Sequence, residues 1–167
     1  YVSVITFDSS ARQAVPLTDL LSFQIPALTA SGTTSLGEAL TLTASSIAKE
    51  VQKTTADTKG DWRPLVFLMT DGSPNDDWRK GLNDFKAART GVVVACAAGH
   101  DADTSVLKEI TEIVVQLDTA DSSTIKAFFK WVSASISVGS QKVESSKKEV
   151  IGLEDLPPPP PEVNVVL

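Results

Sequence analysis

The sequence is poor in cysteine, histidine and long apolar runs, and each shortage excludes a class of protein. It holds one cysteine, Cys96, and one histidine, His100, in 167 residues. A single cysteine cannot form an internal disulfide or a multi-cysteine metal site, and it favours a reducing compartment, so we expect a cytoplasmic protein. His100 stands between Gly99 and Asp101, where we interpret it as part of a turn rather than as a ligand. No apolar run approaches the length needed to span a membrane, so we expect a soluble domain.

Basic residues are too few for a nucleic-acid footprint. Lys and Arg number 15 against 21 Asp and Glu, which gives a formal net charge of −6. This balance disfavours a phosphate backbone as partner and favours cations or basic protein surfaces. The chain is 42% hydrophobic, enough at this length for one domain with a sizeable core.

Apolar runs alternate with helical patterns over residues 1–138. Short runs without polar alternation indicate strands that are covered on both faces. They lie at residues 65–69, 91–97 and 113–117. Helical patterns stand before, between and after them, at residues 36–51, 76–89, 104–110 and 122–137. This order predicts an α/β fold, a doubly wound and mostly parallel sheet with helices on both faces and one antiparallel edge strand.

The first residues predict a β-hairpin. Val2–Phe7 is rich in β-branched residues, Asp8–Ser10 supplies a turn, and Ala11–Val15 is the candidate partner strand. Pro16 cannot donate to a ladder, so we expect an edge position there. Further on, Ser35 and Glu38 have the spacing of a capping box at the start of a helix.

The composition changes at Gly139. Residues 140–148 are polar, and Pro157–Pro161 is an unbroken proline run, which predicts polyproline II. We therefore expect residues 139–167 to form a linker and a terminal peptide outside the domain. The proline run serves either as a stiff spacer or as a ligand for an aromatic groove.

The stretch PLVFLMTDGSPN, residues 64–75, places a carboxylate at the end of a central strand. Asp71 follows the apolar run after a single residue, Thr70, and open α/β sheets bind ligands at the carboxyl ends of their strands. Thr33 and Thr34 lie in the loop before a helix, where hydroxyls can also face a ligand. The structural alternatives are that Asp71 caps the next helix or forms an Asx turn, and that Thr34 is a helix cap.

Three segments, VSVITFDSSA, SGTTSLGEAL and MTDGSP, resemble the von Willebrand factor A (vWA) family, and the order of elements agrees from Tyr1 to about Val138. Within that family the chain is most similar to the bacterial tellurium-resistance proteins of the TerY type, which are stand-alone cytoplasmic domains. The resemblance implies a metal-ion-dependent adhesion site (MIDAS), at which a divalent cation bridges to an Asp or Glu of a partner protein. It implies binding rather than catalysis, in a tellurite-resistance or stress response.

The resemblance assigns the metal to Asp71 and Thr34, with Thr33 as the fallback for Thr34. The family's Asp-x-Ser-x-Ser motif is missing, because Asp8-Ser9-Ser10 has the residue types but the wrong spacing and follows the wrong strand. Two protein ligands predict weak binding, of magnesium first and of manganese or calcium as alternatives.

The loop beyond Asp71 is expected to select the partner. Its candidate contact residues are Thr33, Ser73, Asn75, Asp76 and Trp78. For Trp78 two interpretations stand side by side: it packs on its own helix, or it presents an aromatic anchor to the partner.

The missing motif also suggests a further N-terminal strand and helix, without which two strand edges lack partners. A bolder hypothesis has Val163–Leu167 fill the vacant place, either in its own chain or in a neighbouring one. Two other functions stay open, a magnesium-dependent hydrolase or phosphotransferase and a scaffold with an incomplete metal site. No phosphate-binding loop or nucleophile elbow supports the first.

Overall fold

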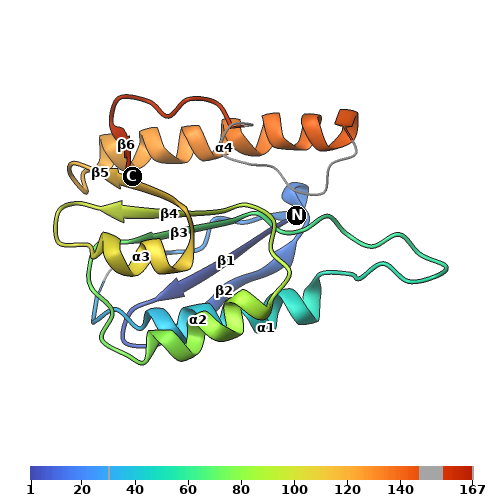
Figure 1. Ribbon diagram of the computed structural model, residues 1–167, viewed down its shortest axis with the longest axis horizontal. Coiled ribbons are helices and arrows are strands. Elements are labelled where there is room, and N and C mark those ends of the chain that lie inside the picture. Colours follow the sequence, from blue (N-terminus) through green and yellow to red (C-terminus); the bar gives the residue numbers. More distant parts are fainter. Residues whose placement is uncertain (30, 147–155, 167) are drawn as a thin grey trace. The chain divides into compact units, whose positions relative to one another are not determined.

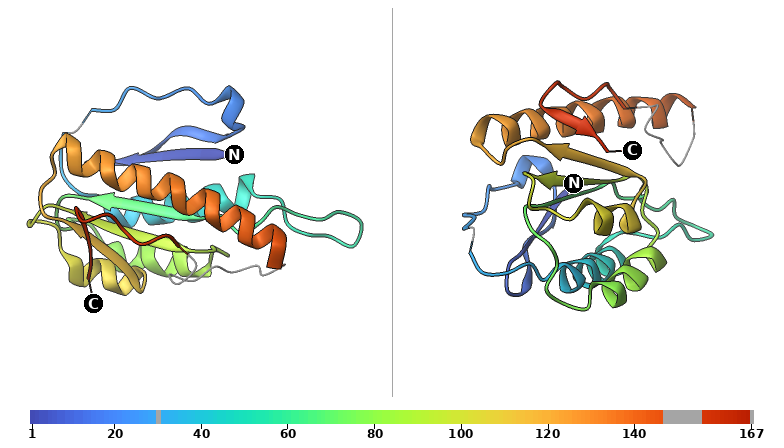
Figure 2. Two further views of the ribbon diagram at one scale, coloured as in Figure 1. Left: turned by 90° about the horizontal axis from the view of Figure 1, so that it is seen from above. Right: turned by 60° about the vertical axis from the view of Figure 1, so that its left-hand side comes forward.

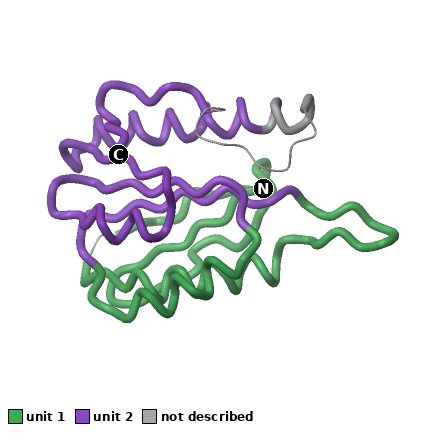
Figure 3. Tube along the Cα trace, in the orientation of Figure 1, with its two compact units in different colours: residues 1–61, 74–89 green, residues 62–73, 90–167 purple. Residues whose placement is uncertain are grey.

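A computed structural model describes residues 1–29, 31–146 and 156–166 (Figure 1). The chain divides into two compact units, each with its own sheet (Figure 3). Unit 1 comprises residues 1–61 and 74–89, and unit 2 comprises residues 62–73 and 90–167.

Unit 1 opens with the predicted hairpin. Strands β1 (Val2–Phe7) and β2 (Ala11–Thr18) are antiparallel, with Phe7 opposite Ala11. The second strand runs past Val15, where the sequence predicted its end. Val4 pairs with Val15 and Val2 with Thr18, so two residues of β2 stand opposite one residue of β1. A bulge of this kind leaves a residue outside the ladder, which is why the strand tolerates Pro16.

Two helices and one 3-10 turn complete unit 1: η1 (Leu20–Ser22), α1 (Leu36–Glu50) and α2 (Trp78–Ala87). Helix α1 packs on both strands and on α2. The two helices approach closely because glycines meet where they cross. A Cβ on Gly37 would lie 2.7 Å from the carbonyl oxygen of Asp77, and a Cβ on Gly81 would collide with the backbone of Gly37. The predicted helices are confirmed, with ends shifted by one or two residues.

Unit 2 contains the parallel sheet. Strands β3 (Val66–Thr70), β4 (Val93–Ala98) and β5 (Ile113–Leu117) are parallel, and β6 (Val163–Val165) joins β5 antiparallel, in the order β3-β4-β5-β6. Two helices belong to this unit, α3 (Thr104–Ile110) and α4 (Ser122–Ser146). This is the doubly wound arrangement that the sequence predicts.

Helices cover both faces of this sheet (Figure 2). Alternate residues of β4, among them Val94 and Cys96, form one core cluster with Phe128 and Trp131 of α4. Helix α3 contacts β4 and β5. Because successive side chains of a strand point to opposite faces, the buried Ala95 faces away from α4.

The C-terminal prediction needs correction. Helix α4 continues past Ser137 to Ser146, and Val163 is 3% exposed within the core cluster, so part of the expected tail belongs to the sheet. Within one chain the strand forms beside β5, not beside β3, so it does not fill the vacant place there; Leu167 lies outside the described residues. That the segment fills this place in a neighbouring chain stays a prediction.

In the described part of the chain, β1 pairs only with β2 and β3 only with β4. Among those residues, no helix combines the length and the apolar character needed to cross a bilayer.

Candidate functional site

Asp71 lies directly after β3, in the turn where the sequence predicted it. Thr70, the residue before Asp71, closes this turn. The hydroxyl of the buried Thr70 donates to the carbonyl of Gly72 (3.3 Å) and accepts from the amide of Gly72 (3.4 Å). The side chain of Asp71 is exposed, and within the described residues its carboxylate accepts no hydrogen bond. The alternatives of a helix cap and an Asx turn are therefore not realised, and the carboxylate is free to take an external ligand.

Thr34 lies in unit 1, two residues before α1. Its carbonyl accepts from the amide of Leu36 (2.9 Å) and from the amide of Asn75 (3.1 Å). The side chain is half-buried, and among the described residues its hydroxyl makes no hydrogen bond. The backbone of Thr34 is thus fixed from two sides while its hydroxyl stays available.

The loop that carries Thr33 is tied to the hairpin turn. The amide of Thr33 donates to Ser9 Oγ (3.3 Å), and the amide of Ser35 donates to the carbonyl of Asp8 (2.8 Å). Gly32 has φ +82°, and a Cβ there would lie 2.5 Å from Ser9 Oγ, so only glycine fits this close approach. The sequence predicted the hairpin turn, but nothing local to it indicated that the turn would hold the threonine loop.

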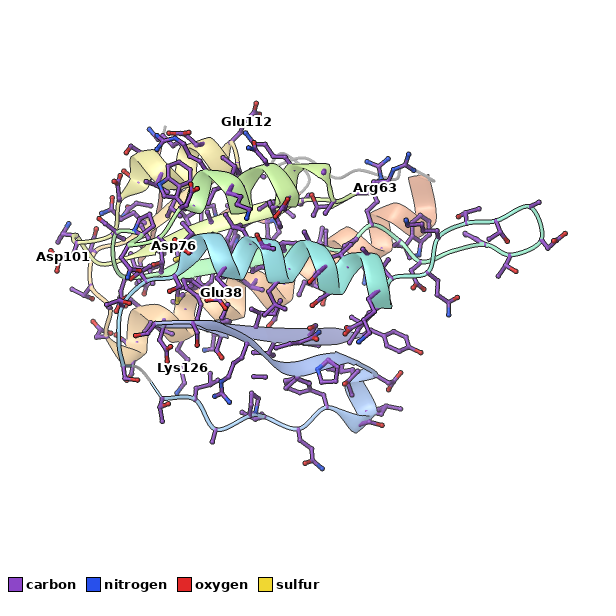
Figure 4. All side chains as sticks on the ribbon, turned by 90° about the horizontal axis from the view of Figure 1, so that it is seen from below. Glu38, Arg63, Asp76, Asp101, Glu112 and Lys126 are labelled. Carbon is purple, nitrogen blue, oxygen red and sulfur yellow. The ribbon has the colours of Figure 1, made fainter. Side chains whose placement is uncertain are left out.

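Asp76 caps helix α1 from a distant part of the chain. Its two carboxylate oxygens accept from the amides of Gly37 (3.0 Å) and Glu38 (2.9 Å), and Figure 4 shows Asp76 and Glu38 at this end of the helix. The predicted capping box is wrong, because Ser35 makes no side-chain cap bond. A carboxylate supplies two acceptors and a full negative charge at the positive end of the helix, which a serine hydroxyl cannot match. Whether Asp76 also contacts a partner stays a prediction.

Trp78 packs rather than projects. Its side chain is 8% exposed, and the guanidinium of Arg79 lies 4.5 Å from the centre of the ring system. This favours the packing interpretation over the aromatic anchor. Ser73 and Asn75 are exposed and remain candidates for partner contact.

Residues 1–131 match the von Willebrand factor type A domain in a comparison with protein families. The chain belongs to this family. The resemblance inferred from the three motifs is therefore confirmed at the level of the family, whose members are commonly metal-dependent protein-interaction modules. A comparison with curated proteins gives no match.

The predicted site residues of this vWA domain fall into both units. Thr33, Thr34, Asn75 and Asp76 lie together in unit 1 through the contacts above, whereas Asp71 and Ser73 belong to unit 2. That Asp71 and Thr34 hold one cation stays a prediction. Among the described residues, no three or more His, Cys, Asp or Glu side chains form a group that could hold a metal.

The donor types nevertheless suit a hard cation. Asp71 offers a carboxylate and Thr34 a hydroxyl, neither of them engaged by the described protein groups, and Mg²⁺ and Ca²⁺ prefer oxygen ligands. The chain's own residues fit such an ion in kind, and water would supply the remaining ligands.

Two other acids near strand ends of unit 2 have structural tasks instead. The hydroxyl of Ser105 and two backbone amides lower the pKa of Asp103, which caps α3. Hydroxyls of Ser123 and Thr119, with backbone amides, lower the pKa of Asp121 at the start of α4. Both carboxylates are engaged in hydrogen bonds at the start of a helix, so neither is a candidate ligand of the metal site.

Proposed function

We propose that this vWA domain grips a partner protein through a divalent cation held by Asp71 and Thr34, with Thr33 as the alternative to Thr34. When bound, the cation supplies a coordination position for an Asp or Glu of the partner. Magnesium is the first candidate, with manganese or calcium as alternatives. The function is binding, without turnover.

The observation that carries the proposal is the state of Asp71. It is an exposed carboxylate that accepts no hydrogen bond from the residues that the structure describes, placed directly after β3, in a family whose members commonly bind proteins through a metal. A carboxylate with no structural task at the carboxyl end of a parallel strand is available for ligand binding.

Each residue has a defined task in this proposal. Asp71 provides negative charge and a direct or water-mediated ligand, and Thr34 provides a neutral hydroxyl from a loop whose backbone is fixed by Asn75. The exposed Ser73 and Asn75 would contact the partner. The formal net charge of −6 attracts cations to the protein in general. The test therefore has to distinguish coordination by Asp71 from this general electrostatic attraction.

Calorimetry of the whole chain with Mg²⁺, Mn²⁺ and Ca²⁺ tests the site. Asp71→Asn is expected to abolish the binding heat. The matched control Asp101→Asn removes the same charge from an exposed aspartate in the loop after β4 (Figure 4) and is expected to leave binding nearly unchanged. If the two variants lose affinity equally, general electrostatics accounts for binding and Asp71 is not a ligand.

A second pair of variants tests the threonine. Thr34→Val keeps the shape and removes the hydroxyl, whereas Thr34→Ser keeps the hydroxyl. The proposal expects weaker metal binding in the first and rescue in the second. Reduced binding in Thr33→Val alone would transfer the role to Thr33.

We further propose a cytoplasmic, TerY-type role in tellurite resistance or another stress response. The motif resemblance supports this, together with the low cysteine content. Growth on tellurite of cells that lack the protein, complemented with the wild type or with Asp71→Asn, is the test. Equal growth of both complemented strains would show that tellurite resistance does not depend on Asp71.

A further inference from the structure

The C-terminal strap, residues 156–166, lies along α4. The indole Nε1 of Trp131 donates to the carbonyl of Pro157 (2.8 Å), and this tryptophan is 4% exposed. Strap and helix together line a groove of about 560 Å³. On the helix side the lining includes Lys126, Lys130 and Ala134. The proline run is therefore bound to the domain by its backbone.

The strap then adds a strand to the sheet. Val163 pairs with Leu117 and Val165 with Val115, and the amide of Val166 donates to the carbonyl of Val114 (2.8 Å). The side chain of Val163 is buried, at 3% exposure. In addition, Asn164 Nδ2 donates to Asp118 Oδ1 (2.9 Å).

These contacts have the chemistry of peptide recognition. An indole that binds a proline carbonyl, an open strand edge and an apolar pocket for one β-branched side chain are the elements with which domains bind extended peptides. Consecutive prolines fix the backbone before binding, so little conformational entropy is lost when the strap docks. In the strap only Glu162 is charged, and the main-chain contacts do not depend on which chain supplies the strap.

We propose that the face formed by α4 and β5 is a peptide-binding site that takes the strap of a second copy of this chain in exchange for its own. The segment that fits the site is already known, because it occupies it within one chain. A tethered strap competes at an effective concentration of the order of millimolar. At micromolar protein concentration, each chain's own strap therefore fills the site of that chain. The strap of a second copy can bind there once the chain's own strap is displaced.

The first test uses a fluorescent peptide with the sequence of residues 156–166 and the full chain. Val163→Asp puts a charge into the core and displaces the chain's own strap, so this variant is expected to bind the peptide at least about tenfold more tightly than the wild type. Val165→Asp is the matched control, since it adds the same charge in the same strand at a side chain that is 37% exposed. Equal peptide binding by all three proteins would overturn the proposal.

Folding of the variants is checked by thermal melting. If Val163→Asp does not fold, Val163→Thr replaces it, because threonine keeps the shape of valine and exchanges one buried methyl group for a hydroxyl, which weakens docking without adding a charge. This variant is expected to bind more peptide than the wild type, and wild-type behaviour would overturn the proposal.

The second test asks whether another copy is the source of the strap. Ala134→Arg fills the groove from an exposed position of α4, so this variant has a blocked site and an undocked strap. Val163→Asp has the opposite defect, an empty site and a strap that cannot dock. Sedimentation of the mixture is expected to show a one-to-one complex that neither variant forms alone. Absence of this complex, even with peptide binding in the first test, would overturn exchange between copies.

Discussion

Replacing Asp76 with alanine should destabilise the protein through helix α1, although Asp76 lies far from α1 in sequence. Its carboxylate accepts two amides of the first turn of α1, at 3.0 and 2.9 Å. Loss of a capping side chain costs about 0.5–2 kcal/mol of the free energy of unfolding. Loss of a negative charge at a helix N-terminus adds about 0.3–1 kcal/mol. We therefore expect Asp76→Ala to lower the free energy of unfolding by about 1–3 kcal/mol.

Urea denaturation followed by tryptophan fluorescence measures this change. For a chain of this size the same loss corresponds to a fall in Tm of about 2–12 °C. Asp76→Asn, which keeps an acceptor and loses the charge, should give a smaller loss.

The neighbouring aspartate provides the control. Asp77 is exposed and stands at the N-cap of α2, but its side chain makes no cap bond, so Asp77→Ala loses only the charge at the helix N-terminus and should cost no more than about 1 kcal/mol. If both alanine variants lose the same stability, the cap geometry at Asp76 does not stabilise α1, and the reasoning is refuted.

Gly81→Ala should lower the urea midpoint although alanine favours helices, because its methyl group meets the backbone of Gly37; an unchanged midpoint would contradict the close crossing. Glu50→Ala should cost about 1–3 kcal/mol in the same assay, since Glu50 accepts from the Leu17 amide (2.7 Å) and from Gln13, and Glu50→Gln should cost less. The pKa of Asp121 is lower in the folded than in the unfolded chain, so its stabilisation is present above about pH 4 and lost as pH falls through the folded pKa; Asp121→Ala should flatten the acid limb of a Tm–pH profile. Burial raises the pKa of Cys96 to about 12, so it should react with a thiol reagent only after unfolding.

The strands of unit 2 could be predicted because their signal is local. The apolar runs that become β3 and β5 carry no polar alternation, as expected for strands covered on both faces. The structure confirms both strands and their parallel arrangement through β4. Helix α3 was equally predictable, since its cap Asp103 adjoins it in sequence.

The cap of α1 could not be predicted from spacing. Ser35 and Glu38 have the right separation for a capping box, yet the amides bind Asp76 instead. A local rule compares only neighbouring residues, whereas this cap depends on the chain returning from β3 and bringing a carboxylate to the helix end. A capping box is a tendency that a stronger, distant acceptor overrides.

The candidate site was predictable only in part: its local turn could be predicted, but the contacts between distant segments could not. The strand and turn around Asp71 predicted an exposed carboxylate at a strand end, and the structure has one there. The contacts that hold the Thr34 loop, from Ser9 and Asn75, join separate segments of unit 1. No sequence pattern encodes such distances, so the prediction that Asp71 and Thr34 hold one cation has to be tested by the calorimetry above.

The strap shows how a short strand joins a core at a place in the sheet that the sequence did not predict. Strand β6 spans only Val163–Val165, too few residues for a periodic pattern. Burial of one valine contributes only about 1.5–3 kcal/mol, comparable to the cost of ordering one or two flexible residues. The five prolines before it change this balance, because their φ angles are already fixed in the unfolded chain. The same proline run that indicates a linker by composition therefore lowers the entropy lost on docking. For this reason proline runs followed by one or two β-branched residues are better interpreted as candidate ligands for a sheet edge than as spacers alone.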